Sequence, residues 1–137
     1  MPCRDHVAQV VAHYPQIQAA NAQVVTISFG PAQWAPVWLQ ETQSPFPLLL
    51  DTDRAAYRAY GLDSSARRSW SAQNLLYYAK ARLQGRQTYG KRGDTNQLGG
   101  DFVIDPQGII RLAHPSYEPT DRTAVSTVLS LLHTLNQ

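Results

Sequence analysis

The sequence contains a single cysteine, Cys3, among its 137 residues. One cysteine excludes a disulfide within the chain, and chains without disulfides are typical of reducing compartments. No apolar run reaches the roughly 20 residues that a transmembrane helix needs, and no signal peptide precedes the first predicted helix. We therefore expect a cytoplasmic protein that has no membrane partner.

Several recognisable kinds of site are also missing from the sequence. No glycine-rich phosphate loop follows a predicted strand, and no serine nucleophile elbow or internal repeat occurs. Cys3 and His6 have the spacing of two metal ligands on one helix, but a stable site needs more ligands and no second cysteine exists. We therefore predict neither a metal nor a cofactor.

Charged residues make up only 16% of the chain, and the net charge of +2 hides an uneven distribution. No acidic residue lies between Asp63 and Asp94, where seven of the twelve basic residues occur: Arg67, Arg68, Lys80, Arg82, Arg86, Lys91 and Arg92. A basic patch can attract nucleic acid or anionic substrates, but charges as diffuse as these favour a solvated surface. We predict one domain over residues 1–137 with a basic insertion at about 63–100, and we do not expect a nucleic-acid partner.

Cys3 lies at the start of a predicted amphipathic helix. The helix has apolar side chains at the spacing of one buried face, at Val7, Val10, Val11, Tyr14 and Ile17. Pro2 fits the first turn, where unpaired N–H groups and the positive end of the helix dipole favour a thiolate, the nucleophilic form of cysteine. Arg4 and His6 could assist. The alternative is that Cys3 is a small apolar residue that packs, and its position alone leaves both open.

The rest of the chain predicts alternating strands and helices. A strand buried on both faces is predicted over residues 23–29 and a second short buried strand over 46–50. Short helices are predicted over 32–42 and 54–60, a further helix over 69–84, and a closing helix over 119–135. Two strands at 101–105 and 109–113 flank a turn and form a hairpin. This order indicates an α/β sandwich around a mixed sheet, with two parallel strands, a C-terminal antiparallel hairpin and flanking helices.

Five segments in this order resemble the redoxins. They are PCR (2–4) at a helix start, VVTIS (24–28), FPLLLD (46–51), YRAYGL (57–62) and DFVIDPQGII (101–110). Together they are most similar to the peroxiredoxin-like branch, the alkyl hydroperoxide reductase/thiol-specific antioxidant proteins of the thioredoxin-like fold. The resemblance covers nearly the whole chain except the basic insertion.

The resemblance implies a thiol-dependent antioxidant oxidoreductase. Cys3 matches the peroxidatic position, where the sulfur attacks a hydroperoxide and becomes a sulfenic acid; beside Pro2 it also matches the second cysteine of a thioredoxin-type motif. A one-cysteine peroxidase needs an external thiol of the thioredoxin, glutaredoxin or glutathione type, and the family also admits a homodimer. Cys3 and Arg4 are the predicted catalytic residues. The alternative is a catalytically degenerate redoxin module in which Cys3 is structural.

The sequence departs from the family at several site positions. The threonine or serine that holds the peroxide would precede Met1, and the arginine that steadies the thiolate is matched by Gly99. Arg4, Arg67, Arg68 or Arg92 could replace that arginine. Gly100 matches the cis-proline of thioredoxins, which argues against a dithiol–disulfide reductase.

The largest departure is architectural. The fold implied by the resemblance has a central strand that runs into the cysteine helix and lies between residues 24–29 and 102–105. Without it, both neighbouring strands keep unpaired backbone groups, at a cost of about 1–3 kcal/mol for each buried one. The favoured interpretation is an N-terminally shortened sequence. The alternatives are direct pairing of the two neighbours or a strand from another chain.

Overall fold

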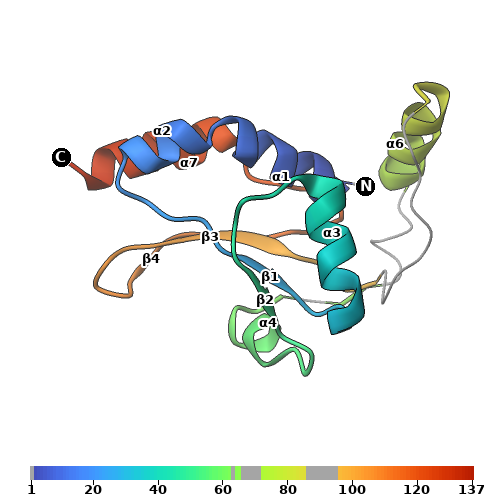
Figure 1. Cartoon of the computed structure of the whole chain (residues 1–137), viewed down its shortest axis with the longest axis horizontal. Coiled ribbons are helices and arrows are strands. Elements are labelled where there is room, and N and C mark those ends of the chain that lie inside the picture. The colour runs from blue at the N-terminus through green and yellow to red at the C-terminus, as the bar shows by residue number, and fades with distance from the viewer. Residues whose placement is uncertain (1, 63, 66–71, 86–95) are drawn as a thin grey trace.

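The computed structural model describes residues 2–62, 64–65, 72–85 and 96–137. It confirms the mixed α/β character that the sequence predicts (Figure 1). In chain order the elements are α1 (Pro2–Ala12), α2 (Tyr14–Ala19), β1 (Thr26–Ser28), the 3-10 turn η1 (Ala32–Trp34), α3 (Ala35–Thr42), β2 (Leu48–Leu50), α4 (Ala55–Ala59), α6 (Ala72–Leu83), β3 (Gly100–Ile104), β4 (Ile110–Pro115) and α7 (Val125–Leu135). None of the helices in these described ranges combines the length and apolar character needed to cross a bilayer.

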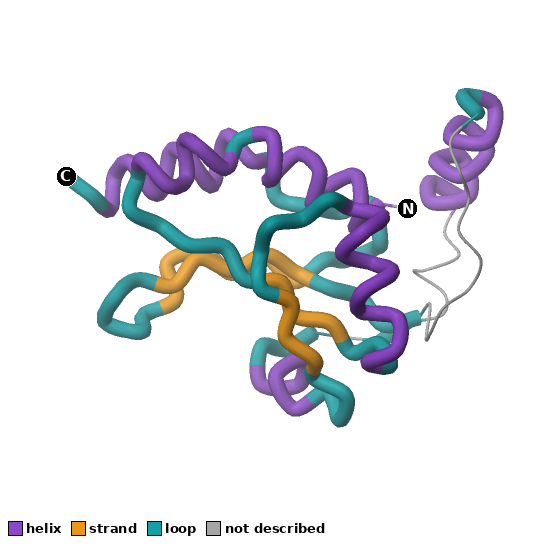
Figure 2. The backbone as a smooth tube through the Cα atoms, in the orientation of Figure 1, coloured by secondary structure: helices purple, strands orange, loops and turns teal. Residues whose placement is uncertain are grey.

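The helices lie on two sides of the strands. α1, α2 and α7 run along one side and α4 lies on the other (Figures 1 and 2). α6 lies next to the start of α1, where the hydroxyl of Tyr77 donates to Asp5. Ile17 of α2 and Leu132 of α7 are buried, as the apolar spacing of both helices predicts. Among the residues that the structure describes, Phe46, Ala81, Leu98 and Val125 are also buried. The α1–α2 layer therefore carries Cys3 on a helix that the core holds in place.

The first helix is interrupted at His13. α1 ends at Ala12, and the chain continues as α2 with Pro15 in its first turn. A proline there loses no helical hydrogen bond, because the first-turn N–H groups have no acceptor within the helix. The break lies far from Cys3, so the start of α1 is unaffected by it.

The hairpin β3–β4 confirms its prediction and is organised by the side chain of Asp105. Its Oδ1 accepts hydrogen bonds from the backbone N–H groups of Gln107 and Ile109, and its Oδ2 accepts one from Arg111 Nε at 2.7 Å. Gly108 closes the turn with φ of 81°, a conformation that glycine adopts without a steric penalty. The hairpin places Asp101 and Gly99 at the end next to the start of α1.

The strands form two separate pairs in the described part of the chain. β1 pairs with β2 in parallel, with Thr26 opposite Leu48, and β3 pairs with β4 antiparallel. Between the pairs lies a slot of about 1440 Å³ that residues of β1, β3, α1, α2 and α7 line. Direct pairing of β1 with β3, one of the alternatives for the missing central strand, is therefore wrong.

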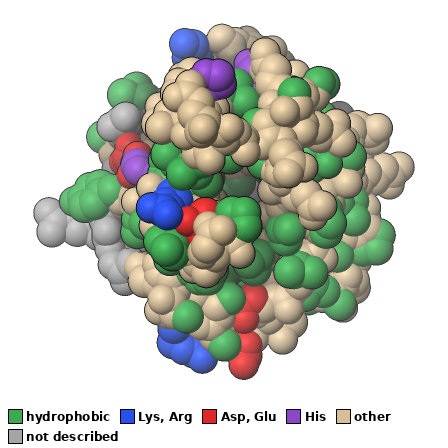
Figure 3. Space-filling model, turned by 90° about the vertical axis from the view of Figure 1, so that its left-hand side faces the viewer, with side chains coloured by type: hydrophobic (Ala, Val, Ile, Leu, Met, Phe, Trp, Pro, Cys, Tyr) green, Lys and Arg blue, Asp and Glu red, His purple; other side chains and the backbone are tan. Residues whose placement is uncertain are grey.

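Two predictions about the first strands are wrong for the same reason. β1 is shorter than residues 23–29, and it is not buried on both faces, because Val25 and Ile27 are 50% and 40% exposed. Leu49 of β2 is 54% exposed as well. A strand is buried on both faces only when neighbouring elements cover it, and Val25 and Ile27 line the slot instead of packing against a neighbouring element. Figure 3 shows hydrophobic side chains at the surface with few charged ones among them.

The closing helix also begins later than predicted. α7 starts at Val125, and residues 116–124 form an irregular loop, here called the Arg122 loop. Two of its N–H groups are taken by carboxylates instead of helical carbonyls: Tyr117 donates to Asp121, and Thr123 donates to Asp101. The N–H of Thr123, which lies inside the predicted helix, is thus bonded to Asp101 instead of a helical carbonyl, and this competing acceptor explains why α7 does not extend back to residue 119.

Candidate active site

Cys3 lies in the first turn of α1, as the sequence predicts, and its side chain is exposed. Pro2 is buried and anchors this end of the helix. The N–H groups of the first turn carry the positive end of the helix dipole, which favours negative charge on the sulfur. The sulfur also accepts a hydrogen bond from Nη2 of Arg122 at 2.9 Å. Two independent sources of positive charge therefore meet at one thiol.

The guanidinium of Arg122 lies against Gly99. A Cβ atom at residue 99 would come within 2.9 Å of Nη1, so a side chain there would have to displace the arginine. Gly99 is the position where the resemblance leads one to expect the thiolate-steadying arginine. A guanidinium thus occupies the space beside residue 99, but it comes from the Arg122 loop.

Arg122 is the site residue that the sequence analysis missed. The substitutes considered were Arg4, Arg67, Arg68 and Arg92, because Arg122 fell inside the helix predicted over residues 119–135. Residues 67, 68 and 92 lie outside the described residues. A useful signal was the break in apolar periodicity before Val125, which marks residues 119–124 as a segment with no apolar face of its own.

Asp101 joins the two segments that carry the sulfur and the guanidinium. Its Oδ1 lies 3.0 Å from Nε2 of His6 on α1, and its Oδ2 accepts the backbone N–H of Thr123 at 3.0 Å. Burial favours the protonated acid, but the hydrogen bonds from His6 and Thr123, with the charges of His6 and Arg122, outweigh it and lower the pKa of Asp101. At neutral pH the carboxylate is therefore ionised and holds both partners.

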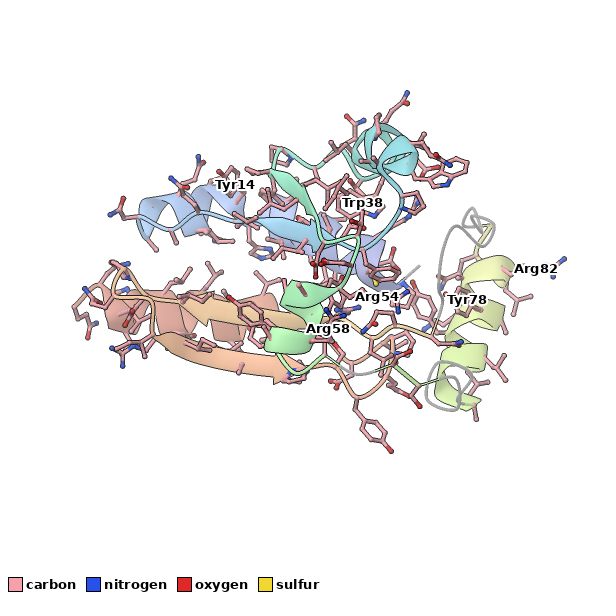
Figure 4. The ribbon with its side chains drawn as sticks, turned by 90° about the horizontal axis from the view of Figure 1, so that it is seen from below. Tyr14, Trp38, Arg54, Arg58, Tyr78 and Arg82 are labelled. Carbon is pink, nitrogen blue, oxygen red and sulfur yellow. The ribbon has the colours of Figure 1, made fainter. Side chains whose placement is uncertain are left out.

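Two tyrosines have pKa values on which the sulfur of Cys3 acts. The hydroxyl of Tyr57, from α4, donates to the carbonyl oxygen of Ile27 at 3.2 Å. Burial raises the pKa of Tyr57 to about 12, the sulfur of Cys3 acts in the same direction, and Arg122 opposes both. Burial and Cys3 also raise the pKa of Tyr78, which projects from α6 toward the body of the molecule (Figure 4). Both phenols therefore stay protonated at neutral pH and can only donate or accept hydrogen bonds.

Cys3 and Arg122 both line the slot between the strand pairs. The aromatic side chains of Phe29, Trp34, Tyr57 and Tyr78 also line it. A thiol and a cation thus lie side by side in a recess whose walls are largely apolar. Water still reaches the exposed sulfur, so the attraction between a thiolate and Arg122 is close to its value in water.

The other residues near the start of α1 tie the helix to its neighbours. Arg4 forms an ion pair with Glu41 of α3, and the hydroxyl of Tyr77 on α6 donates to the carboxylate of Asp5. A catalytic role for Arg4 remains a prediction from the sequence. His6, which was weighed as a metal ligand with Cys3, bonds to Asp101 through Nε2 instead.

The basic insertion lies only partly in the described residues. Lys80 and Arg82 are exposed near the C-terminal end of α6, and Arg82 points away from the molecule in Figure 4. Arg67, Arg68, Arg86, Lys91 and Arg92 lie outside the described ranges. The predicted insertion and the predicted single domain therefore stay predictions.

We compared the sequence with curated proteins and with models of protein families. None of the curated proteins compared with it matches. A family model described as AhpC/TSA antioxidant enzyme matches residues 9–118. Cys3 and Arg122 both lie outside the matched residues, so the match carries no statement about either. Residues 9–118 are most of the chain and include every described strand, and the chain therefore belongs to the AhpC/TSA antioxidant enzyme family, the peroxiredoxin-like redoxins.

Proposed function

We propose that this thiol-dependent antioxidant oxidoreductase is a one-cysteine peroxidase that reduces hydroperoxides through Cys3. The observation that carries the proposal is the 2.9 Å hydrogen bond from Arg122 to the sulfur of Cys3 at the start of α1. An exposed cysteine beside an arginine and a helix N-terminus has the surroundings of a reactive thiol. A cysteine that only packs would be expected inside the core.

The reaction begins with the thiolate of Cys3. Its sulfur attacks the distal oxygen of a hydroperoxide ROOH, so that an S–O bond forms as the O–O bond breaks. The oxygen that leaves takes a proton and departs as the alcohol ROH, or as water when the substrate is hydrogen peroxide. The cysteine becomes a sulfenic acid, having lost two electrons to the peroxide.

Arg122 contributes charge at two points of this step. It stabilises the thiolate before the attack, and its guanidinium lies within reach of the oxygen on which negative charge develops. An arginine keeps its charge at every pH of interest and presents several N–H donors in one plane. The same group can therefore serve the thiolate and the departing oxygen in turn.

Regeneration of Cys3 requires an external thiol in this proposal, because the sequence contains no second cysteine. A first thiol attacks the sulfenic sulfur and releases water, which leaves a mixed disulfide on Cys3. A second thiol attacks that disulfide, frees Cys3 as a thiol and leaves as a disulfide. A family of thiol-dependent antioxidant enzymes implies such a reductant in general. Its identity as a thioredoxin, glutaredoxin or glutathione type belongs to the proposal.

The test is peroxide consumption with dithiothreitol as the reductant. We expect the protein to consume hydrogen peroxide or cumene hydroperoxide, Cys3→Ser to consume none, and Arg122→Gln to be slower. Arg82→Gln is the matched control, because Arg82 is an exposed arginine remote from the sulfur. Consumption by Cys3→Ser equal to that of the unmodified chain would reject Cys3 as the nucleophile.

The second candidate is a catalytically degenerate redoxin module in which Cys3 is structural. The observation that favours it is Gly99, which stands at the position where the resemblance leads one to expect the thiolate-steadying arginine. It predicts no peroxide consumption and a loss of stability in Cys3→Ser. An exposed cysteine contributes little to packing, so unchanged stability in Cys3→Ser would count against this candidate.

A further inference from the structure

Asp101 makes two contacts that converge on the candidate site from different elements. Its carboxylate is about four-fifths buried, with the side chain 19% exposed, and both oxygens are used. Oδ1 meets His6, one helical turn after Cys3, and Oδ2 meets the N–H of Thr123, the residue that follows Arg122. One side chain of β3 thus fixes the helix that carries the sulfur and the backbone that carries the guanidinium.

The sequence separation of Cys3 and Arg122 explains why the contacts of Asp101 matter. The hydrogen bond between Arg122 and Cys3 joins residues 119 positions apart, so no local backbone geometry sets it. The Arg122 loop is irregular, and an arginine side chain has several rotatable bonds that must be held in one geometry. Pinning the backbone at Thr123 removes much of that freedom and places the guanidinium between Gly99 and the sulfur.

The negative charge of Asp101 and its contacts with His6 and Thr123 are expected to affect the Cys3 thiolate in opposite directions. A carboxylate disfavours ionisation of any thiol that its charge reaches, so a direct electrostatic effect of Asp101 on Cys3 could only oppose the thiolate. The carboxylate also attracts Arg122, whose charge lowers the pKa of Asp101. Neutralising Asp101 therefore has opposite consequences under two hypotheses. If only charge matters, the thiolate becomes more stable; if position matters, it becomes less stable.

We propose that Asp101 is the positioning residue that holds Arg122 against the sulfur of Cys3. It touches neither the peroxide nor the sulfur, and it acts by joining α1 to the Arg122 loop. The proposal rests on the proposed function only in taking Cys3 as the reactive group. It is tested without peroxide, so the failure of peroxidase activity and the failure of this proposal can be told apart.

The experiment follows the rate at which Cys3 reacts with the neutral disulfide dithiodipyridine as a function of pH. The midpoint of this profile reports the ionisation of the thiol, because only the thiolate attacks. We expect Asp101→Asn to raise the midpoint by about half a unit and, because a more basic thiolate is also a better nucleophile, to slow the reaction about twofold at pH values well below it. A lowered or unchanged midpoint would overturn the proposal, because that is the result of the charge effect alone.

The same substitution in an Arg122→Gln background separates an effect on the position of Arg122 from a general loosening of the Arg122 loop. In Arg122→Gln we expect Asp101→Asn to cause no further rise of the midpoint, because the group that it positions is already missing. A rise of equal size in both backgrounds would also overturn the proposal.

Two further variants keep the test decisive if Asp101→Asn folds poorly. His6→Ala breaks only the α1 end of the bridge, and His6→Gln keeps a side-chain donor for Asp101. We expect the first to slow the disulfide reaction and the second to restore much of the rate. Equal rates for the two would contradict the bridge.

Asp121→Asn is the matched control for loop stability. Asp121 precedes Arg122 in the chain, as Thr123 follows it. Its carboxylate likewise accepts a backbone N–H, that of Tyr117 at 2.7 Å, and lies 2.9 Å from Nε2 of His114. These contacts hold the loop to itself and to β4 but do not reach α1. We expect a smaller midpoint change than in Asp101→Asn at a similar loss of stability. An equal change would mean that loosening the loop anywhere is sufficient.

Discussion

Replacing Arg122 by glutamine removes the one charged partner of the Cys3 sulfur that the described residues show within hydrogen-bond distance. Two unit charges about 4 Å apart attract by about 1 kcal/mol in water and by more when partly shielded from it. Cys3 is exposed, so the lower value applies, and a hydrogen bond to a charged group at the surface adds little to it. About 1 kcal/mol corresponds to roughly a fivefold smaller thiolate fraction at pH values below the midpoint.

The rate changes less than the thiolate fraction does. A more basic thiolate is also a better nucleophile, and this gain offsets close to half of the loss on a logarithmic scale. We therefore expect Arg122→Gln to react about two- to threefold more slowly with dithiodipyridine at low pH and about twofold faster on the high-pH plateau. The two profiles should cross. Arg122→Lys keeps the charge and should lie between them.

The assay is stopped-flow absorbance of the released thiopyridone across pH 5–10, with Arg82→Gln as the control. A profile for Arg122→Gln that coincides with that of the unmodified chain would refute the reasoning, because the guanidinium would then do nothing for the sulfur. A uniform slowing at every pH would also refute it. Such slowing would indicate a change in access to the thiol instead of a change in its ionisation.

Three further predictions concern two glycines and one aspartate. Gly99→Ala should reproduce most of the Arg122→Gln profile, because its Cβ would come within 2.9 Å of Nη1 and the guanidinium is free to move away. Gly100→Ala should instead lower the free energy of unfolding by about 1–3 kcal/mol, measured by urea denaturation, since its Cβ would meet the backbone oxygen of a neighbouring strand at 2.8 Å. Hydrogen bonds from the turn N–H groups and Arg111, led by that of Ile109, lower the pKa of Asp105 against the opposing effect of burial. A pKa that is lower in the folded state adds stability at neutral pH, and this stability is lost as the pH falls from about 4 through the folded value. We therefore expect the urea midpoint of Asp105→Asn to depend less steeply on pH in that range. An unchanged slope would contradict the role of this carboxylate.

The local elements were predictable from the sequence because short-range rules decide them. The apolar spacing from Val7 to Ile17 is enough to define α1 and α2, and Pro2 marks the start of α1. The turn between β3 and β4 follows from Asp105 and Gly108, whose roles are local. Placing Cys3 in the first turn of a helix was therefore within reach of sequence reasoning alone.

The partner of the sulfur was not predictable in the same way. Arg122 was assigned to a helix because the apolar pattern of α7 was extended back to residue 119. Its actual conformation depends on Asp101, 22 residues away in sequence, which takes the N–H of Thr123. No pattern within residues 116–124 encodes that contact, so it emerges only when β3, α1 and the loop are packed together.

The burial of β1 and β2 was mispredicted for a related reason. Apolar, β-branched runs indicate strands, but whether both faces are covered depends on the neighbours that the strand receives. In the described residues β1 has one neighbour, and Val25 and Ile27 are left facing the slot. The slot lies between β1 and β3, the two strands between which the fold implied by the resemblance has its central strand.

The most direct test of the central claim is a single-turnover reaction of reduced protein with one equivalent of hydrogen peroxide, in the presence of dimedone. Dimedone labels a sulfenic acid, and peptide mass spectrometry locates the label. The account predicts labelling on Cys3 that proceeds much faster in the folded protein than in the urea-unfolded chain at the same pH, because only the folded state brings Arg122 and the start of α1 to the sulfur. Equal labelling rates for the folded and unfolded chains would contradict it.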